Sequence, residues 1–226
     1  SPLLNHAIGG EYPPGSTFKI VPAAAALEEG VITANTQLYC AGTLWLPNEF
    51  MPDDPSKAQP FYCWVHSGHG VVNLAASLAY SCDIYYYQVG GGYKDFRGLG
   101  LERLGRYARE FGFGARTGIA LPGEAAGLVP TERWKRENWD MNWVTGDTYN
   151  ISIGQGYILS TPLQLLNAFA AIANGGTLYR PQVVHQIVDV DGNVVQTMQP
   201  EMIRQVPVSP QNIELVRSGM RAAATW

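Results

Sequence analysis

The sequence predicts an α+β domain with its helices in the middle of the chain and its strands late. Apolar residues recur at helical spacing through most of the middle region. Two β-branched runs, at 183–190 and 194–198, flank an Asp-Gly-Asn turn at 191–193, which is a hairpin signal. The chain has 226 residues, of which 46% are hydrophobic and 15% are charged, so it can bury one large core.

Turn and capping residues predict the first elements. A Pro-Pro-Gly turn at 13–15 precedes an apolar-periodic helix from about residue 16 to 29, which Gly30 closes. Residues 34–70 are rich in Pro, Gly and aromatics and show no sustained period, so we expect a long excursion with short strands. Structureless connections of that length are uncommon, so we also expect a cross-link, such as a metal ion or a disulfide, to hold this segment.

The helices of the middle region follow from their start signals. Asn73 is placed to cap a helix that ends at Tyr80, and a second helix begins near Cys82. An amphipathic segment at 101–111 predicts another helix, whereas 114–150 is predicted as loop and short strands.

The last helices also begin at strong start signals. A Ser-Thr-Pro sequence at 160–162 starts a helix that runs to Ala173, and a Ser-Pro pair at 209–210 opens the final one. The chain starts and stops abruptly, so we expect it to be a piece of a longer protein, with the main sheet partly beyond Trp226.

Charge and hydropathy bear on two classes of function, nucleic-acid binding and membrane spanning. A formal charge of −4 and a pI near 5.5 leave no basic surface, so we expect no nucleic-acid partner. No apolar run reaches the roughly 18 residues that cross a bilayer, and no signal-peptide pattern is present. Any anchor is expected outside this piece, so the sequence itself says nothing about location.

Ser16 and Lys19 form a candidate nucleophile and base. A serine hydroxyl is a poor nucleophile until a neighbour takes its proton. In a helix that starts at Ser16, Lys19 lies one turn along on the same face, beside apolar neighbours that would desolvate its amine. The helix N-terminus favours developing negative charge. A serine before a helix is also a common N-cap, and a Ser-x-x-Lys pair arises readily by chance.

Several motifs give these two residues a family context. The segment 5–19, with its core Gly-Glu-Tyr-Pro-Pro-Gly-Ser-Thr-Phe-Lys, resembles the first motif of class B penicillin-binding proteins. The Ser-Cys-Asp sequence at 81–83 resembles the second motif, Ser-x-Asn, in a Ser-x-Asp form. That aspartate and a Gly-Asp-Thr sequence at 146–148 are similar to the elongation-type, penicillin-binding protein 2 group. Further segments match the family as well: 68–70, 153–157, 160–164 and 179–181.

The resemblance implies a penicillin-binding-protein and serine β-lactamase-like fold, a helical subdomain with an antiparallel sheet. It also implies D,D-transpeptidation of peptidoglycan stem peptides that end in D-Ala-D-Ala. Ser16 would attack the D-Ala-D-Ala carbonyl to form an acyl-enzyme, its N–H would supply one oxyanion donor, and Lys19 would take the hydroxyl proton. Ser81 would relay a proton to the leaving amine, and Asp83 would position Lys19 and the substrate. β-Lactams would be trapped at the same serine as mimics of the acyl donor.

This sequence departs from the family pattern in two places. Asp83 brings a carboxylate where the family usually has an amide. The third motif, Lys-[Ser/Thr]-Gly, is absent, and the family's spacing puts it shortly after Trp226. We therefore expect 1–226 to be a partial transpeptidase domain, without the N-terminal anchor and pedestal region and without the C-terminal part, and active only with the missing third motif.

Three cysteines and a histidine form a candidate metal site. Three thiols and an imidazole are the usual ligands of a closed, tetrahedral structural zinc ion. Such a site would tie the 34–70 excursion to the second motif and make that motif rigid. Related elongation-type proteins carry metal-ligand residues at similar positions, some with Asp at the first two. The ligands would be Cys40, Cys63, His69 and Cys82, which use every cysteine of the chain.

The cysteines also allow an alternative. A Cys40–Cys63 disulfide, which suits a protein outside the cytoplasm, would leave Cys82 as a buried thiol. The odd number of cysteines weakens a pure disulfide account. His66 competes with His69 as the fourth ligand, but it has no motif match and is predicted to lie on the surface.

Trp64, Asp147 and Gln155 are the candidates for substrate contact. For the tryptophans and for Gln155, a structural role is the alternative to substrate contact. Trp139 and Trp143 have the spacing of packed helix residues, and Gln155 lies between two glycines that allow a close backbone approach, which suits a loop-shaping residue.

Two rival functions use the same fold. In a β-lactamase or D,D-carboxypeptidase, water would resolve the acyl-enzyme, but the sequence offers no evident deacylation base. A penicillin-binding sensor would acylate once and signal. For the transpeptidase, the family implies action at the extracytoplasmic face of the bacterial cell membrane, with a rod-complex glycosyltransferase and scaffold proteins as partners.

Overall fold

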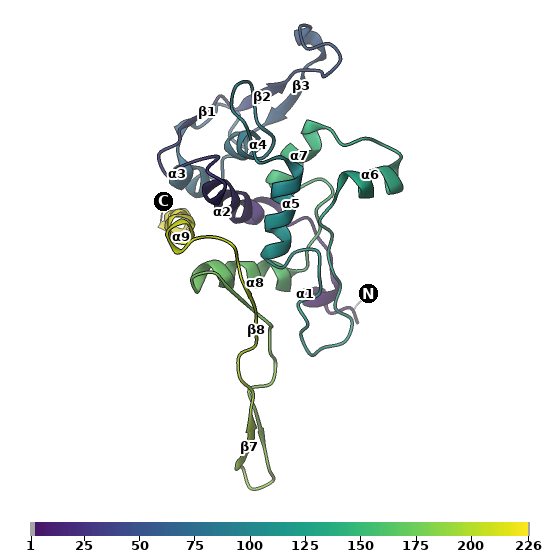
Figure 1. Cartoon of the computed structure of the whole chain (residues 1–226), viewed down its shortest axis with the longest axis vertical. Helices are drawn as coiled ribbons and strands as arrows, with labels where there is room; N and C mark the ends of the chain where they lie inside the picture. The colour runs from purple at the N-terminus through teal and green to yellow at the C-terminus, as the bar shows by residue number, and fades with distance from the viewer. Residues whose placement is uncertain (1–2, 226) are drawn as a thin grey trace.

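A computed structural model describes residues 3–225, and its helices surround one central helix (Figure 1). That helix, α2 (Ile20–Glu28), continues directly from the 3₁₀ turn η1 (Gly15–Lys19) and is buried along nearly its whole length. Its alanines at 23–26 are fully covered, because small side chains let neighbouring elements approach closely. The helices that pack on it are α4 (Asp83–Gly91), α5 (Gly100–Glu110) and α9 (Pro210–Thr225).

The remaining helices extend this core. The short helix α3 packs against α9, α7 packs against α4, and α8 packs against α1 and α9. Their bounds are α1 (His6–Gly9), α3 (Leu74–Ala79), α7 (Thr145–Ser152) and α8 (Pro162–Ala173). Between residues 3 and 225, no helix combines the length and the hydropathy that crossing a bilayer requires.

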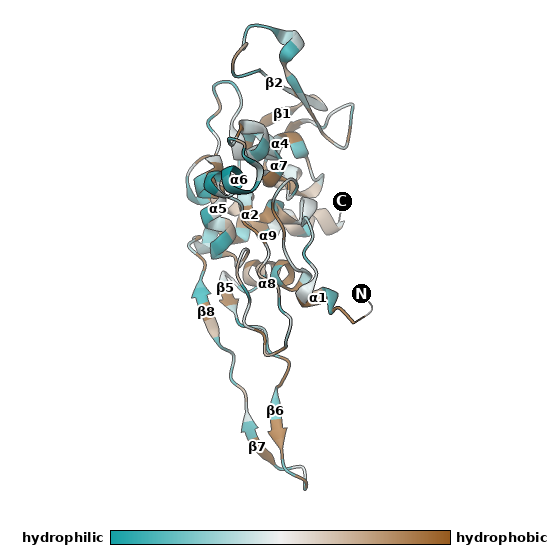
Figure 2. Cartoon of the chain, turned by 90° about the vertical axis from the view of Figure 1, so that its right-hand side faces the viewer, coloured by the Kyte–Doolittle hydropathy of each residue, from teal (hydrophilic) through white to brown (hydrophobic). Residues whose placement is uncertain are grey.

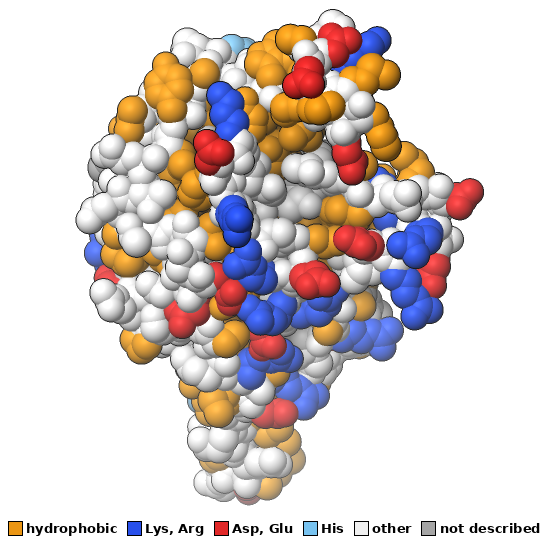
Figure 3. Space-filling model, turned by 45° about the horizontal axis from the view of Figure 1, so that its top comes forward, with side chains coloured by type: hydrophobic (Ala, Val, Ile, Leu, Met, Phe, Trp, Pro, Cys, Tyr) orange, Lys and Arg blue, Asp and Glu red, His pale blue; other side chains and the backbone are white. Residues whose placement is uncertain are grey.

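The excursion predicted after α2 forms the top of the molecule in Figure 1. Its strands are β1 (Leu38–Cys40), β2 (Thr43–Leu46), β3 (Gln59–Tyr62) and β4 (Gly70–Val72), with a 3₁₀ turn η2 (Pro55–Lys57). Strand β1 pairs with β4 and β2 pairs with β3, both antiparallel. Figure 3 shows hydrophobic side chains over the upper part of the face where the top comes forward. The exposed ones of the excursion include Tyr39, Trp45, Phe50, Met51, Tyr62, Trp64 and Val71.

A long hairpin projects from the opposite end of the molecule (Figure 2). Strand β5 pairs with β8 and β6 pairs with β7, both antiparallel and both with an irregular register. Every residue of β6 and β7 is exposed. The predicted hairpin around 191–193 is therefore confirmed, with strands shorter than the sequence runs. The bounds are β5 (Thr177–Tyr179), β6 (Gln186–Val188), β7 (Val194–Thr197) and β8 (Met202–Gln205).

The structure corrects the prediction of loop and short strands for 114–150. That region contains helix α6 (Glu132–Trp139) and most of α7. Helix α6 lacks the apolar stripe by which a helix is recognised in a sequence, and its single buried residue is Lys135. Helix α7 contains glycine and threonine, which have low helix propensity, and its packing against α4 compensates for them.

The helix predicted from about residue 16 to 29 is divided, with the 3₁₀ turn η1 over Gly15–Lys19 and the α-helix α2 over Ile20–Glu28. The other predicted helices are confirmed, and two of them begin at the expected caps. The Asn73 side chain accepts a hydrogen bond from Ala76 N (3.0 Å) at the start of α3. Thr161 and Gln164 form a capping box at the start of α8. All sheets among the described residues are two-stranded pairs, and the expected extension of the main sheet beyond Trp226 stays a prediction.

Candidate active site and metal centre

The turn before Ser16 is held by a close contact between two backbone segments. Gly15 has a φ of +60°, which favours glycine, and its N–H donates to Gly154 O at 2.8 Å. A Cβ on Gly154 would lie 2.2 Å from Gly15 O, so only glycine fits there. The predicted close approach of this Gly-Gln-Gly loop is therefore confirmed. The result is an exposed Ser16 on a rigidly held turn.

Lys19 lies one turn further along and is 1% exposed. Its Nζ lies 2.6 Å from Asp83 Oδ1, and it donates to Ser81 Oγ at 3.0 Å and to Ser81 O at 2.8 Å. Burial lowers the pKa of Lys19 below the ordinary lysine value of 10.5, and the nearby Asp83 carboxylate opposes that shift. The structure therefore brings together Lys19, Ser81 and Asp83, as the sequence predicts.

The second motif occupies a strained turn between α3 and α4. Ser81 adopts a φ of +53°, a left-handed conformation that costs a non-glycine residue about 1–3 kcal/mol. Asp83 begins α4, and its Oδ2 accepts a hydrogen bond from the backbone N–H of Trp64 at 3.1 Å. The carboxylate thus joins Lys19 to the excursion. Strain of this kind is held in place by its surroundings, which points to function.

Ser16 and Ser81 line one cavity of about 260 Å³. Among the hydrogen bonds of residues 3–225, none joins the Ser16 side chain to Lys19 Nζ, which faces the second motif instead. Catalytic hydrogen bonds are often long before substrate binds and tighten in the complex. The remaining lining is mostly apolar: Thr17, Ile20, Leu78, Ala79, Phe169, Met220 and Ala223.

The four predicted metal ligands converge behind the second motif. Their donor atoms all lie within 4.8 Å of one another, and His69 Nδ1 lies 3.6 Å from Cys40 Sγ and 3.4 Å from Cys63 Sγ. In a tetrahedral zinc site with Zn–S of about 2.3 Å and Zn–N of about 2.0 Å, sulfur and nitrogen ligands lie about 3.5 Å apart. The fourth donor belongs to Cys82, the middle residue of the second motif. His66 lies outside this group.

The chemistry of the donors also suits a metal. All three thiols are free and buried. A hydrogen bond from the Cys82 thiol lowers the pKa of Cys63 below the ordinary thiol value, although burial opposes the shift, and metals bind the thiolate form. The imidazole of His69 contacts two aromatic rings, those of Trp64 and Tyr80, with centroids 5.7 Å away in each case.

The three candidate substrate residues have different environments. Trp64 is 64% exposed beside the second motif, and its indole N–H donates to Tyr80 O at 2.9 Å. Gln155 is exposed and lies next to Gly15. The Asp147 carboxylate is paired with Lys135 Nζ at 2.5 Å in a nearly buried position, and its contact with substrate stays a prediction.

Lys135 is the residue of this region that sequence reasoning misses. It lies in a polar stretch, Glu-Arg-Trp-Lys-Arg-Glu-Asn-Trp, where a lysine normally faces water. Trp134, Trp139 and Trp143 all pack against the ring of Tyr157. Trp139 and Trp143 do not share a helix, since α6 ends at Trp139, so their packing comes from tertiary structure and not from the predicted helical spacing.

Comparisons with known proteins agree with this geometry. A sequence model of the penicillin-binding protein transpeptidase domain matches residues 1–225. Peptidoglycan D,D-transpeptidase MrdA of Escherichia coli K12 is 35% identical over 224 residues, which cover 99% of this chain and 33% of that protein. MrdA of Acinetobacter baumannii is 37% identical over 183 residues, 81% of this chain and 25% of that protein.

A solved structure is similar over the whole chain. Penicillin-binding protein 2 of Pseudomonas aeruginosa, in complex with WCK 5153, has a TM-score of 0.80 and 30% identity, covering 99% of this chain and 50% of that one. These matches confirm the predicted fold class. The chain spans between a quarter and a third of the length of the two curated relatives. It belongs to the penicillin-binding protein transpeptidase family, within the penicillin-binding protein 2 group of class B.

Proposed function

We propose that this chain is the core of a serine-type peptidoglycan D,D-transpeptidase that cross-links stem peptides in cell-wall elongation and is inhibited by β-lactams. The observation that carries the proposal is the buried amino group of Lys19, held by Ser81 and Asp83 one turn from an exposed Ser16. The relatives that are named peptidoglycan D,D-transpeptidase support the same reaction. The partial domain would act together with the third motif expected after Trp226.

The proposed reaction runs in two acyl-transfer steps. Ser16 Oγ attacks the carbonyl carbon of the D-Ala-D-Ala bond while neutral Lys19 takes the hydroxyl proton. Lys19 passes that proton through Ser81 Oγ, which lies 3.0 Å away, to the nitrogen of the leaving D-Ala. The amine of a second stem peptide then attacks the ester carbonyl and loses its proton to the same relay. A new peptide bond forms, the bond between the carbonyl carbon and Ser16 Oγ breaks, and the relay returns the proton to Ser16 Oγ.

The metal centre is proposed as a structural support. Cys40, Cys63, His69 and Cys82 would hold a zinc ion that supplies a rigid cross-link and takes no part in the chemistry. The convergence of four donor atoms from the excursion and the second motif supports this assignment. Held together in this way, the four ligand residues would keep the Ser81 turn in its strained conformation.

Partners and location are proposed from the relatives. One similar structure is a complex between penicillin-binding protein 2 and MreC from Helicobacter pylori, and another is described as a peptidoglycan synthase complex that coordinates polymerization and crosslinking. We propose that the full-length protein works with a scaffold protein and a glycosyltransferase. Because peptidoglycan is assembled outside the cytoplasm, the full-length protein would act at the extracytoplasmic face of the cell membrane.

An exchange assay on the full-length protein tests the function. Given a stem peptide ending in D-Ala-D-Ala and a labelled D-amino acid, a transpeptidase releases D-Ala and incorporates the label, and benzylpenicillin blocks both events. Release of D-Ala without incorporation would show a carboxypeptidase, and rapid penicillin hydrolysis would show a β-lactamase. Stable penicillin labelling with no peptide turnover would show a sensor. Each of these three results would contradict the proposal.

The pH dependence of acylation should report the neutral form of Lys19. Because burial lowers the pKa of Lys19 below 10.5, the fraction of neutral amine grows as pH rises and passes one half below that value. The second-order rate constant of acylation by penicillin is therefore expected to rise with pH, with the midpoint of the rise below 10.5. Stopped-flow acylation across the pH range checks this. A rate constant that falls as pH rises from neutral would exclude a neutral lysine base.

A further inference from the structure

A buried lysine outside the active site has no role in the proposed reaction. Lys135 is the single buried residue of α6, and its side chain is 2% exposed. Its Nζ lies 2.5 Å from Asp147 Oδ2, and the Asp147 side chain is 12% exposed. A short polar helix on the surface does not need a buried charge for its stability, since such pairs often stabilise less than apolar residues of equal volume. The position of the pair therefore calls for another explanation.

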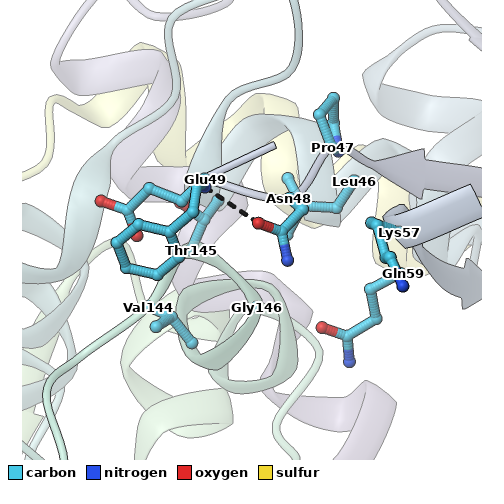
Figure 4. Close-up of a pocket in the computed structure, with 10 residues that line it drawn as sticks. Leu46, Pro47, Asn48, Glu49, Lys57, Gln59, Val144, Thr145 and Gly146 are labelled. Carbon is cyan, nitrogen blue, oxygen red and sulfur yellow. Dashed lines mark hydrogen bonds between the residues drawn. The ribbon is translucent and has the colours of Figure 1, made fainter. Parts of the chain in front are cut away.

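The ion-pair partner of Lys135, Asp147, fixes the start of helix α7. Asp147 Oδ2 accepts a hydrogen bond from Val144 N at 2.9 Å, in addition to the ion pair, and so caps the helix. Gly146 in the same turn packs against Phe61 of the excursion, where an added Cβ would lie 2.9 Å from Phe61 Cζ. Val144, Thr145 and Gly146 line a cavity of about 240 Å³ together with residues of the excursion such as Asn48. Figure 4 shows these residues around the cavity.

Another contact of Lys135 fixes the chain beyond the end of α7. Its Nζ lies 5.5 Å from the ring centroid of Tyr157 and 5.9 Å from that of Trp143, which are cation–π distances. Trp134 and Trp139 pack against the same Tyr157 ring, at 5.4 and 5.7 Å. One ammonium group therefore touches both ends of the segment 144–157.

The loop near the end of that segment supports the nucleophile. Gly154 O accepts the hydrogen bond from Gly15 N, and a Cβ on Gly154 would collide with Gly15 O and with Phe18. Ser16 follows Gly15 directly. We infer that Lys135 is a positioning residue for Ser16: it fixes both ends of segment 144–157, and the loop at Gly154 sets the backbone of the nucleophile's turn. This inference rests on the proposed function.

Kinetics of acylation in the full-length protein test the inference. The variants are Lys135→Met, the double variant Lys135→Met/Asp147→Asn, and Tyr157→Leu, which cuts the second contact without changing a charge. Saturation kinetics with a fluorescent penicillin separate the dissociation constant from the limiting acylation rate constant per active site. We expect the limiting rate constant to fall about 10- to 100-fold while the dissociation constant changes little, because small misplacements of a reacting group have effects of that size.

A merely structural pair would behave differently. It would lower the melting temperature and the fraction of labelled protein, and leave the rate constant of each active molecule unchanged. The double variant keeps the test decisive if Lys135→Met alone does not fold, because it leaves no unpaired buried charge. Arg133→Met is the matched control, since Arg133 lies on the same helix in an exposed pair with Glu137.

Two outcomes overturn the inference. One is a folded double variant that acylates at the wild-type rate, and the other is a normal rate in Tyr157→Leu. Failure of the proposed function is distinguishable from either, because it would appear as the absence of D-amino acid exchange in the wild-type protein.

Discussion

Replacing Lys19 with methionine is expected to remove most acylation of the protein by penicillin. Methionine keeps the unbranched apolar stem but cannot take a proton, so the acylation rate constant should fall by about 10²- to 10⁴-fold. The change also leaves Asp83, which is 8% exposed, without its cation. Removing one partner of a buried ion pair costs about 3–5 kcal/mol of folding free energy. Labelling kinetics and the melting temperature measure the two effects.

A second variant separates the chemistry from the folding. Lys19→Met combined with Asp83→Asn removes both charges, so much of the lost stability should return. Acylation should stay low, because the base is still missing. If the double variant were acylated at the wild-type rate, Lys19 would not be the base, and the proposed mechanism would be wrong.

Removing a ligand of the metal centre is expected to release zinc and loosen the second motif. The wild-type protein should contain about one equivalent of zinc by elemental analysis, and His69→Ala and Cys82→Ser should contain far less. A structural zinc ion contributes folding free energy directly, so the melting temperature should fall by about 10 °C or more. Acylation should slow as well, because Cys82 lies between Ser81 and Asp83.

His66→Ala is the matched control for the metal centre. His66 is close to His69 in sequence, but its ring contacts Tyr62 (centroids 6.1 Å apart) and it lies outside the thiol cluster. This variant should keep its zinc and its melting temperature. A wild-type protein without zinc, whose mass shows a Cys40–Cys63 disulfide, would contradict the metal site and support the alternative pairing.

Local signals explain why much of the fold is predictable from the sequence. Asn73 and Thr161 cap their helices through contacts within three residues, and Gly30 follows the central helix with a φ of +65°. Helices α6 and α7 are not predicted because contacts with other parts of the chain stabilise them. The buried side of α6 is one lysine, and its partner Asp147 lies on another helix.

The site shows the same division between local and distant causes. Ser16 and Lys19 are predictable because one helical turn joins them. The contacts of Lys19 with Ser81 and Asp83 join residues more than 60 positions apart, and only the family motifs indicate them. The ion pair of Asp147 with Lys135 is another contact that local sequence does not indicate, since nothing in the polar sequence around Lys135 indicates that this lysine is buried.

The proposed reaction requires the Ser16 hydroxyl to become the covalent carrier of the acyl group. The most direct measurement is mass spectrometry of the full-length protein after incubation with benzylpenicillin, with peptide mapping of the adduct. A single benzylpenicilloyl group is expected on Ser16. It should be absent from Ser16→Ala and kept in Ser56→Ala, a change at an exposed serine of η2. An unmodified wild-type protein, or an adduct on Ser81 instead, would contradict the proposed reaction.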